Sequence, residues 1–74
     1  MYVYVEPSPK GQWGPIDGYT LEFEDGIKLT EERFPSEKLA VSEIKLRGYM
    51  PLLPKVRITD KTDTAHWQAA EAAV

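Results

Sequence analysis

Carboxylates are concentrated between residues 22 and 32, and they are the side chains most able to support chemistry or binding. Paired carboxylates can exchange protons, coordinate calcium or attract a basic partner. Calcium loops place alternating oxygen ligands over about twelve residues, a pattern that neither Asp17-Gly18 nor Asp25-Gly26 provides. We therefore expect partner binding by an acidic face that consists of Glu22, Glu24, Asp25, Glu31 and Glu32.

Other catalytic groups are sparse. His66 is the single histidine, and no nucleophile or second acid–base group accompanies it in a motif. The serines lack the Gly-x-Ser-x-Gly pattern, and Gly11-Gln-Trp-Gly14 does not connect a strand to a helix as a phosphate-binding loop does. We expect a protein that is not an enzyme and has no cofactor and no metal site.

Basic and aromatic residues offer an alternative site. Lysine and arginine side chains could contact phosphates while aromatic rings stack on bases. Trp13 lies in a loop rich in proline and glycine, residues 7–18, where it either folds back over the core or stands out as an interface anchor. The alternative site consists of Trp13, Arg47, Tyr49, Lys55 and Arg57.

A β-hairpin must position the acidic face. Residues 19–23 alternate apolar and polar side chains, and so do residues 27–31 after Asp25-Gly26. A three-residue loop with Gly26 left-handed pairs Phe23 with Ile27 and residue 21 with residue 29, which keeps one face apolar. It also places Glu22 opposite Lys28 on a polar face shared with Glu24 and Glu32.

The remaining elements follow from pattern and punctuation. Residues 1–6 predict a strand that is either central in the sheet or buried at a self-association surface. Ser36 and Gly48 delimit a helix over about residues 37–47. Residues 49–54 contain two prolines and predict an irregular connector, whereas residues 55–59 alternate like a strand. Residues 65–74 predict a short helix capped by Asp63 or Thr62.

The chain of 74 residues is long enough for one small domain, residues 1–74. We expect an α+β fold with elements in the order β-β-β-α-β-α. Three or four antiparallel strands carry the main helix on one face, and a short C-terminal helix packs beside it. The absence of cysteine and of a long apolar stretch favours a cytoplasmic protein that does not enter membranes.

Charge is segregated along the chain. Residues 1–32 carry two lysines against seven acidic residues, and residues 33–61 carry seven basic residues against three acidic ones. The signs either pair across the fold or leave one acidic and one basic face. We expect an interaction protein that binds another protein with a basic surface, as an inhibitor or adaptor of bacterial, phage or mobile-element origin. The alternative is a small nucleic-acid-binding regulator that uses residues 33–61.

Overall fold

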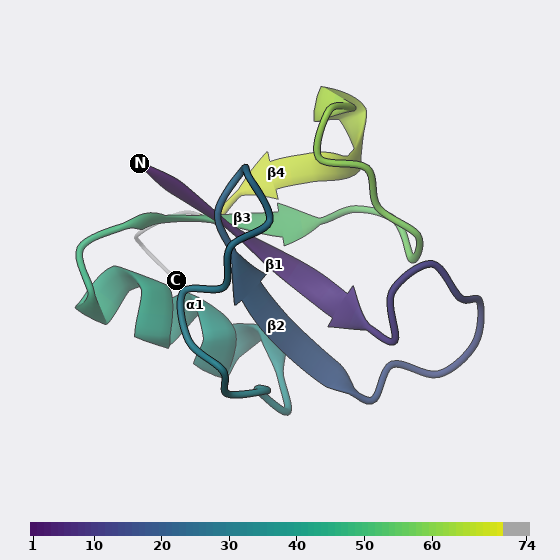
Figure 1. The fold of residues 1–74 in the computed structure, drawn as a ribbon, viewed down its shortest axis with the longest axis horizontal. Coiled ribbons are helices and arrows are strands. Elements are labelled where there is room, and N and C mark those ends of the chain that lie inside the picture. Colours follow the sequence, from purple (N-terminus) through teal and green to yellow (C-terminus); the bar gives the residue numbers. More distant parts are fainter. Residues whose placement is uncertain (71–74) are drawn as a thin grey trace.

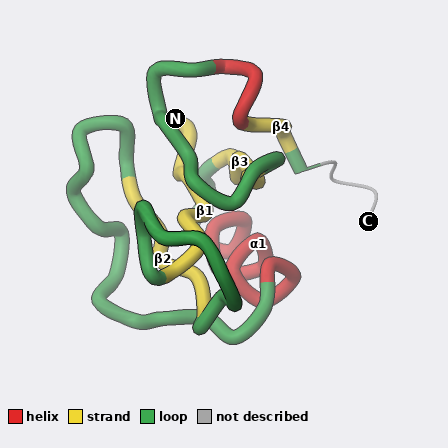
Figure 2. Tube along the Cα trace, turned by 90° about the vertical axis from the view of Figure 1, so that its right-hand side faces the viewer, coloured by secondary structure: helices red, strands yellow, loops and turns green. Residues whose placement is uncertain are grey.

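The computed structural model describes residues 1–70, which form a mixed four-stranded sheet with one α-helix (Figure 1). β1 (Tyr2–Ser8) lies between β2 (Gly18–Glu22) and β3 (Met50–Pro54), and β4 (Trp67–Ala69) pairs with β3. α1 (Glu37–Leu46) lies on one face of the sheet (Figure 2). The expected α+β class is confirmed, but the all-antiparallel sheet is wrong. The connection between β2 and β3, which contains α1, crosses over β1. As a result, β3 runs in the same direction as β1, and the two strands are parallel.

β1 is the central strand of the core. Val3 and Val5 point toward α1 and are fully buried with Leu21, Ala40 and Ile44. Tyr2 and Tyr4 alternate with the valines and therefore point to the opposite face of the sheet. Of the two positions predicted for this strand, the central one is confirmed, because β1 lies between β2 and β3 in the sheet.

Local signals define α1 as predicted. The Ser36 hydroxyl accepts a hydrogen bond from the backbone N–H of Leu39 at 3.2 Å, and the helix begins at the next residue, Glu37. Beyond its last residue, Gly48 has a φ of +86°, and Tyr49 donates its backbone N–H to the carbonyl of Ile44 at 3.1 Å. This i to i−5 bond is the glycine-dependent termination known as the Schellman motif. The structure ends the helix at Leu46, one residue before the predicted end.

The hairpin register is confirmed, but its second arm is not a strand. Phe23 donates its N–H to Ile27 at 2.8 Å, Leu29 donates to Leu21 at 2.9 Å, and Gly26 has a φ of +88°. Glu22 and Lys28 form only an isolated bridge, as the register requires. The chain then leaves the edge of β2 and returns for a second isolated bridge between Tyr19 and Phe34. The predicted third strand is therefore replaced by two single contacts.

The strand assigned to residues 55–59 is wrong, because β3 occupies the Met50–Pro54 segment instead. Its two prolines lack a backbone N–H but lie where no hydrogen-bonded pair needs one. The register with β1 ends at Leu52, before Pro54, and Pro51 lies beyond the last pair with β4, where it accepts a hydrogen bond from Ala70 at 3.1 Å. Residues 55–58 form bends.

The predicted C-terminal helix is also wrong over the described residues. Asp63 caps a turn as predicted, but the turn is a single 3-10 turn, η1 (Thr64–His66), that leads directly into β4. β4 buries Trp67, whose ring packs edge-to-face on Tyr4 at 4.7 Å and whose indole N–H donates to the carbonyl of Asp60 at 2.9 Å. Residues 71–74 of the predicted helix lie outside the described residues. Within residues 1–70, no helix has the length and apolarity to span a membrane.

Candidate functional site

Four of the five predicted acidic residues lie on the exposed surface of the hairpin and the segment after it. No ion pair connects any of the four to a basic side chain in the described part of the chain. The Asp25 carboxylate accepts the backbone N–H of Ile27 at 3.0 Å and so closes the turn. We call this set the acidic hairpin surface, and it consists of Glu24, Asp25, Glu31 and Glu32.

Glu22 does not belong to this surface, and its predicted exposed placement is wrong. Its side chain is 5% exposed, and its carboxylate lies 2.8 Å from the ammonium of Lys61 and 3.0 Å from that of Lys10. The same Lys61 ammonium lies 2.6 Å from a carboxylate oxygen of Glu6, which is 2% exposed. Glu22 and Glu6 project from adjacent strands on the face opposite α1, where Lys61 pairs with both. Sequence periodicity did not reveal this cluster of charges.

The protonation states of the ion cluster argue against acid–base catalysis. Burial raises the pKa of Glu22, but hydrogen bonds from Lys61 and Lys10 outweigh it and hold that pKa below its usual value. Burial lowers the pKa of Lys61, but hydrogen bonds to Glu22 and Glu6 outweigh it and raise that pKa above its usual value. Both groups are therefore charged at neutral pH, whereas a general acid or base works best with a pKa near the working pH. The cluster fastens Lys61 to the sheet.

His66 also makes local contacts that fit a structural role. Its Nδ1 accepts the backbone N–H of Asp60 at 3.0 Å, and its Nε2 lies 3.2 Å from a carboxylate oxygen of Asp63. These contacts join both ends of the turn before β4. Across residues 1–70, no group of three or more histidine, aspartate or glutamate side chains could hold a metal ion.

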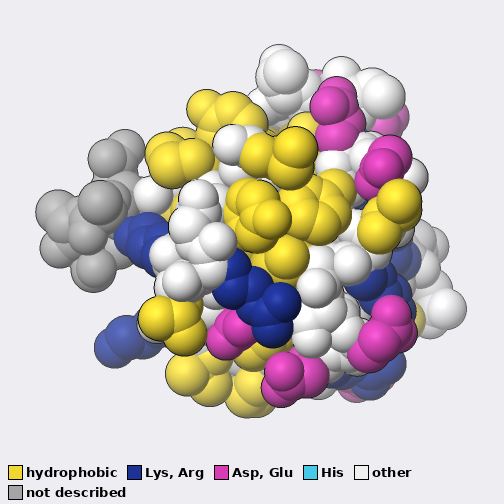
Figure 3. Space-filling view, turned by 60° about the vertical axis from the view of Figure 1, so that its left-hand side comes forward, with side chains coloured by type: hydrophobic (Ala, Val, Ile, Leu, Met, Phe, Trp, Pro, Cys, Tyr) yellow, Lys and Arg dark blue, Asp and Glu magenta, His cyan; other side chains and the backbone are white. Residues whose placement is uncertain are grey.

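An apolar groove lies beside the acidic hairpin surface. Its volume is about 890 Å³, and the residues that line it come from β1 and from both arms of the hairpin. Figure 3 shows hydrophobic side chains gathered on one face of the molecule, with both acidic and basic side chains around them. We call this feature the hairpin groove, and it is lined by Met1, Tyr2, Tyr4, Phe23, Glu24, Asp25 and Ile27. The sequence signal for it was the apolar character of β1 on both faces.

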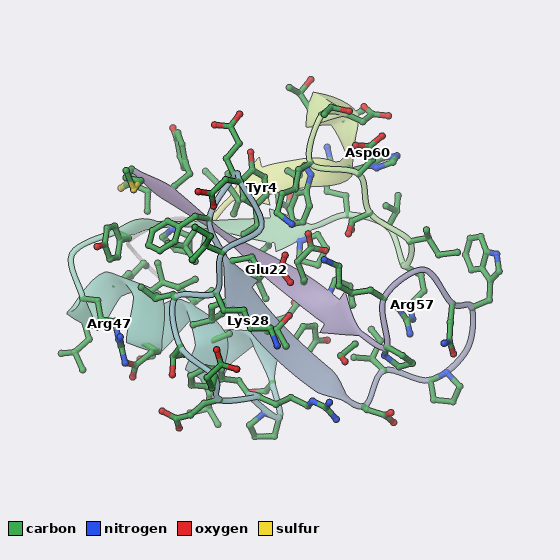
Figure 4. All side chains as sticks on the ribbon, viewed as in Figure 1. Tyr4, Glu22, Lys28, Arg47, Arg57 and Asp60 are labelled. Carbon is green, nitrogen blue, oxygen red and sulfur yellow. The ribbon has the colours of Figure 1, made fainter. Side chains whose placement is uncertain are left out.

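The alternative basic site is not assembled as one surface. Arg47 and Arg57 lie at opposite ends of the molecule (Figure 4). Arg47 pairs with Glu43 at 2.5 Å on α1, and the Tyr49 ring packs edge-to-face on Phe23 at 5.3 Å. Lys55 is exposed in the segment that follows β3.

Within the alternative basic site, a contact brings the segment of Arg57 to the loop that contains Trp13. Arg57 donates from Nε to the carbonyl of Gly14 at 3.0 Å, next to Trp13. The two terminal nitrogens of Arg57 are buried, so the guanidinium is not presented to an incoming phosphate. Trp13 is 80% exposed, which rules out the first of its two predicted roles, a lid on the core, and leaves the interface anchor.

Comparison of the chain with protein-family models, with curated proteins and with solved structures gives no match. Function must therefore be inferred from the chain's own residues. Features of the described residues that are exposed to a partner include the acidic hairpin surface, the hairpin groove beside it and the Trp13 loop.

Proposed function

We propose that this protein is a non-enzymatic interaction module that binds another protein through the acidic hairpin surface and the hairpin groove, as an inhibitor or adaptor. The observation that carries the proposal is their adjacency, because Glu24 and Asp25 belong to the acidic hairpin surface and also line the groove. A partner segment with apolar and basic side chains complements both features at once. Apolar contact then supplies binding free energy, and charge supplies orientation and faster association.

The dimensions and energetics of the site fit this role. Sites that enclose small ligands or anchor side chains have volumes of roughly 300–1,000 Å³, and the hairpin groove falls in that range at about 890 Å³. Carboxylates without an opposite charge repel one another, which lowers folding stability. A partner that brings lysine or arginine relieves this repulsion, so its affinity should fall as salt is added.

Selection from a random peptide display library tests the proposal, because the library samples many partner sequences at once. We expect the immobilised protein to select peptides that combine lysine or arginine with large apolar residues. The matched variants are Glu24→Lys and Asp17→Lys, which make the same change of charge inside and outside the site. Glu24→Lys should lower the affinity of the protein for the selected peptides by about three- to tenfold, and Asp17→Lys should leave that affinity unchanged.

Two results would contradict the proposal. One is a selection that returns acidic or uncharged peptides. The other is equal binding of the selected peptides by Glu24→Lys and the unmodified protein. Binding to heparin and to single-stranded oligonucleotides at moderate salt would instead favour the nucleic-acid regulator, with Trp13 as its stacking residue.

A further inference from the structure

The walls of the hairpin groove combine aromatic rings with carboxylates. Three of the residues that line it are aromatic, namely Tyr2, Tyr4 and Phe23, and two are the acidic Glu24 and Asp25. No lysine or arginine is among the residues of the described chain that line it. The face of an aromatic ring carries negative potential and attracts organic cations within about 6 Å of its centroid. All five side chains therefore favour the same charge in an occupant.

Two of the rings are held in place before any ligand arrives. Phe23 packs edge-to-face on Tyr49 with ring centroids 5.3 Å apart, and Tyr4 packs in the same way on Trp67 at 4.7 Å. Trp67 is in turn fixed by its hydrogen bond to the carbonyl of Asp60. Tyr4 already contacts one cation within the chain, because the Lys61 ammonium lies 5.6 Å from its ring centroid. The Lys61 ammonium over the Tyr4 ring would repel a second cation there, so Tyr2 and Phe23, together with Glu24 and Asp25, are the groups that receive a partner's cation.

We propose that the hairpin groove is a cage for one cationic side chain of the partner, which is lysine, methylated lysine or arginine. This inference rests on the proposed function and names the group that anchors the partner. The aliphatic stem of the side chain lies against Met1 and Ile27, and its cationic head lies between the aromatic rings and the carboxylates of Glu24 and Asp25. An anionic head would be repelled by the same carboxylates, and a neutral apolar group would leave them without a partner.

Short peptides that differ only in one charge provide the test. The probes are glycine–serine peptides with a central trimethyllysine or with its neutral isostere, in which a tert-butyl group replaces the trimethylammonium group. Lysine and arginine peptides, with citrulline as the neutral partner of arginine, extend the series. Titration into ¹⁵N-labelled protein, followed by amide chemical shifts, reports weak binding and its location. We expect each cation to bind about three- to thirtyfold tighter than its neutral partner, with the largest shifts in residues 2–4 and 23–27.

Variants separate the cation effect from general apolar contact. Tyr2 is 52% exposed and outside the core, so Tyr2→Leu should keep the fold and reduce the preference for the cation. Trp13→Leu removes an exposed ring outside the groove and should leave that preference unchanged. Equal binding of trimethyllysine and its isostere would overturn the cage while leaving the proposed function intact. Shifts confined to residues outside the groove would also overturn it, whereas failure of the display selection would overturn the proposed function.

Discussion

Replacement of Lys61 by methionine probes the ion cluster that fastens the segment before β4 to the sheet. Methionine keeps an aliphatic side chain of similar length but removes the ammonium that lies 2.6 Å from Glu6 and 2.8 Å from Glu22. Glu22 would retain Lys10, a side chain that is 53% exposed. Among residues 1–70, Glu6 would retain only the hydrogen bond from the hydroxyl of Thr59. The variant therefore leaves a carboxylate that is 2% exposed without an opposite charge.

The expected loss of stability is large for a domain of this size. Removal of one partner from a buried ion pair costs about 3–5 kcal/mol, and the 15% exposure of the Lys61 side chain places the cost near the lower value. A domain of 74 residues has a total stability of about 4–11 kcal/mol. We therefore expect Lys61→Met to lose about 3 kcal/mol at pH 7 and to be marginally folded.

The charged groups of the cluster make the effect of Lys61→Met on stability depend on pH. In the wild type, the pKa of Glu22 is lower in the folded state than its ordinary value of 4.5, so its contribution to stability is present above that pH and is lost as the pH falls through the folded pKa. The raised pKa of Lys61 has the opposite consequence, because its contribution is complete below 10.5 and is lost as the pH rises through the folded pKa. In the variant, protonation of a buried carboxylate removes an unpaired charge. The stability difference between wild type and variant should therefore shrink from pH 7 to pH 4.

Urea denaturation followed by circular dichroism at pH 7 and pH 4 measures this difference. Lys55→Met is the matched control, because Lys55 is an exposed lysine six residues earlier in the chain, and it should change stability by less than about 0.5 kcal/mol. A cost below about 1 kcal/mol for Lys61→Met would refute the assignment of the cluster as a buried ion pair. An equal cost at both pH values would refute the charge argument in particular.

Two further substitutions test the core and the hairpin. Leu21→Ala should lower the free energy of unfolding, measured by urea denaturation, by about 2–5 kcal/mol because Leu21 is fully buried. The control Leu46→Ala, at a position that is 83% exposed, should lower it by less than about 0.5 kcal/mol. Similar losses for the two variants would contradict the assignment of Leu21 to the core. Gly26→Val should lower the free energy of unfolding by about 1–2 kcal/mol because a β-branched residue resists a φ of +88°. Gly26→Asn should lower it less, because asparagine adopts the left-handed conformation more readily. An unchanged melting temperature for Gly26→Val would exclude the left-handed turn.

The sequence predicted the elements whose determinants lie within a few residues of one another. The Ser36 hydroxyl caps α1 by accepting the backbone N–H of Leu39, three residues later in the chain. At the other end, the backbone N–H of Gly48 bonds to the carbonyl of Lys45 in the last turn of the helix. Likewise, the register of the hairpin depends on Gly26 and on the apolar residues at positions 21, 23, 27 and 29. Such signals operate through local backbone geometry, so a single sequence is enough to recognise them.

The errors concern elements that depend on distant partners. Whether Pro51 and Pro54 interrupt a strand depends on where β1 and β4 end beside them, which the residues around the prolines do not reveal. The segment around Trp67 was too short to form a stable helix alone. It pairs with β3 instead, and this pairing buries the indole against Tyr4 on a strand more than sixty residues earlier. Both outcomes follow from tertiary contacts that override local propensity.

The candidate site was partly predictable for the same reason. Alternation places Glu22 and Glu24 on the same face of a strand, but it does not say which of them the rest of the chain covers. Lys61 lies 39 residues after Glu22 and reaches back to cover it, whereas Glu24 projects beyond that cover and remains exposed. The hairpin groove required the positions of β1 and the hairpin relative to each other, and these are set by the fold.

The ion cluster also explains why acidity is concentrated on the hairpin. Of the two arrangements that charge segregation suggested, the structure contains part of each. Lys61 pairs across the fold with Glu6 and Glu22, so folding neutralises the carboxylates that it buries. The four carboxylates of the acidic hairpin surface do not pair with Lys61 and remain exposed. The exposed carboxylates of the acidic hairpin surface each act over about a Debye length, close to 8 Å in physiological salt. Glu24 and Asp25 line the hairpin groove, so under the proposed function their charge and the apolar contact surface would guide a partner to the same place.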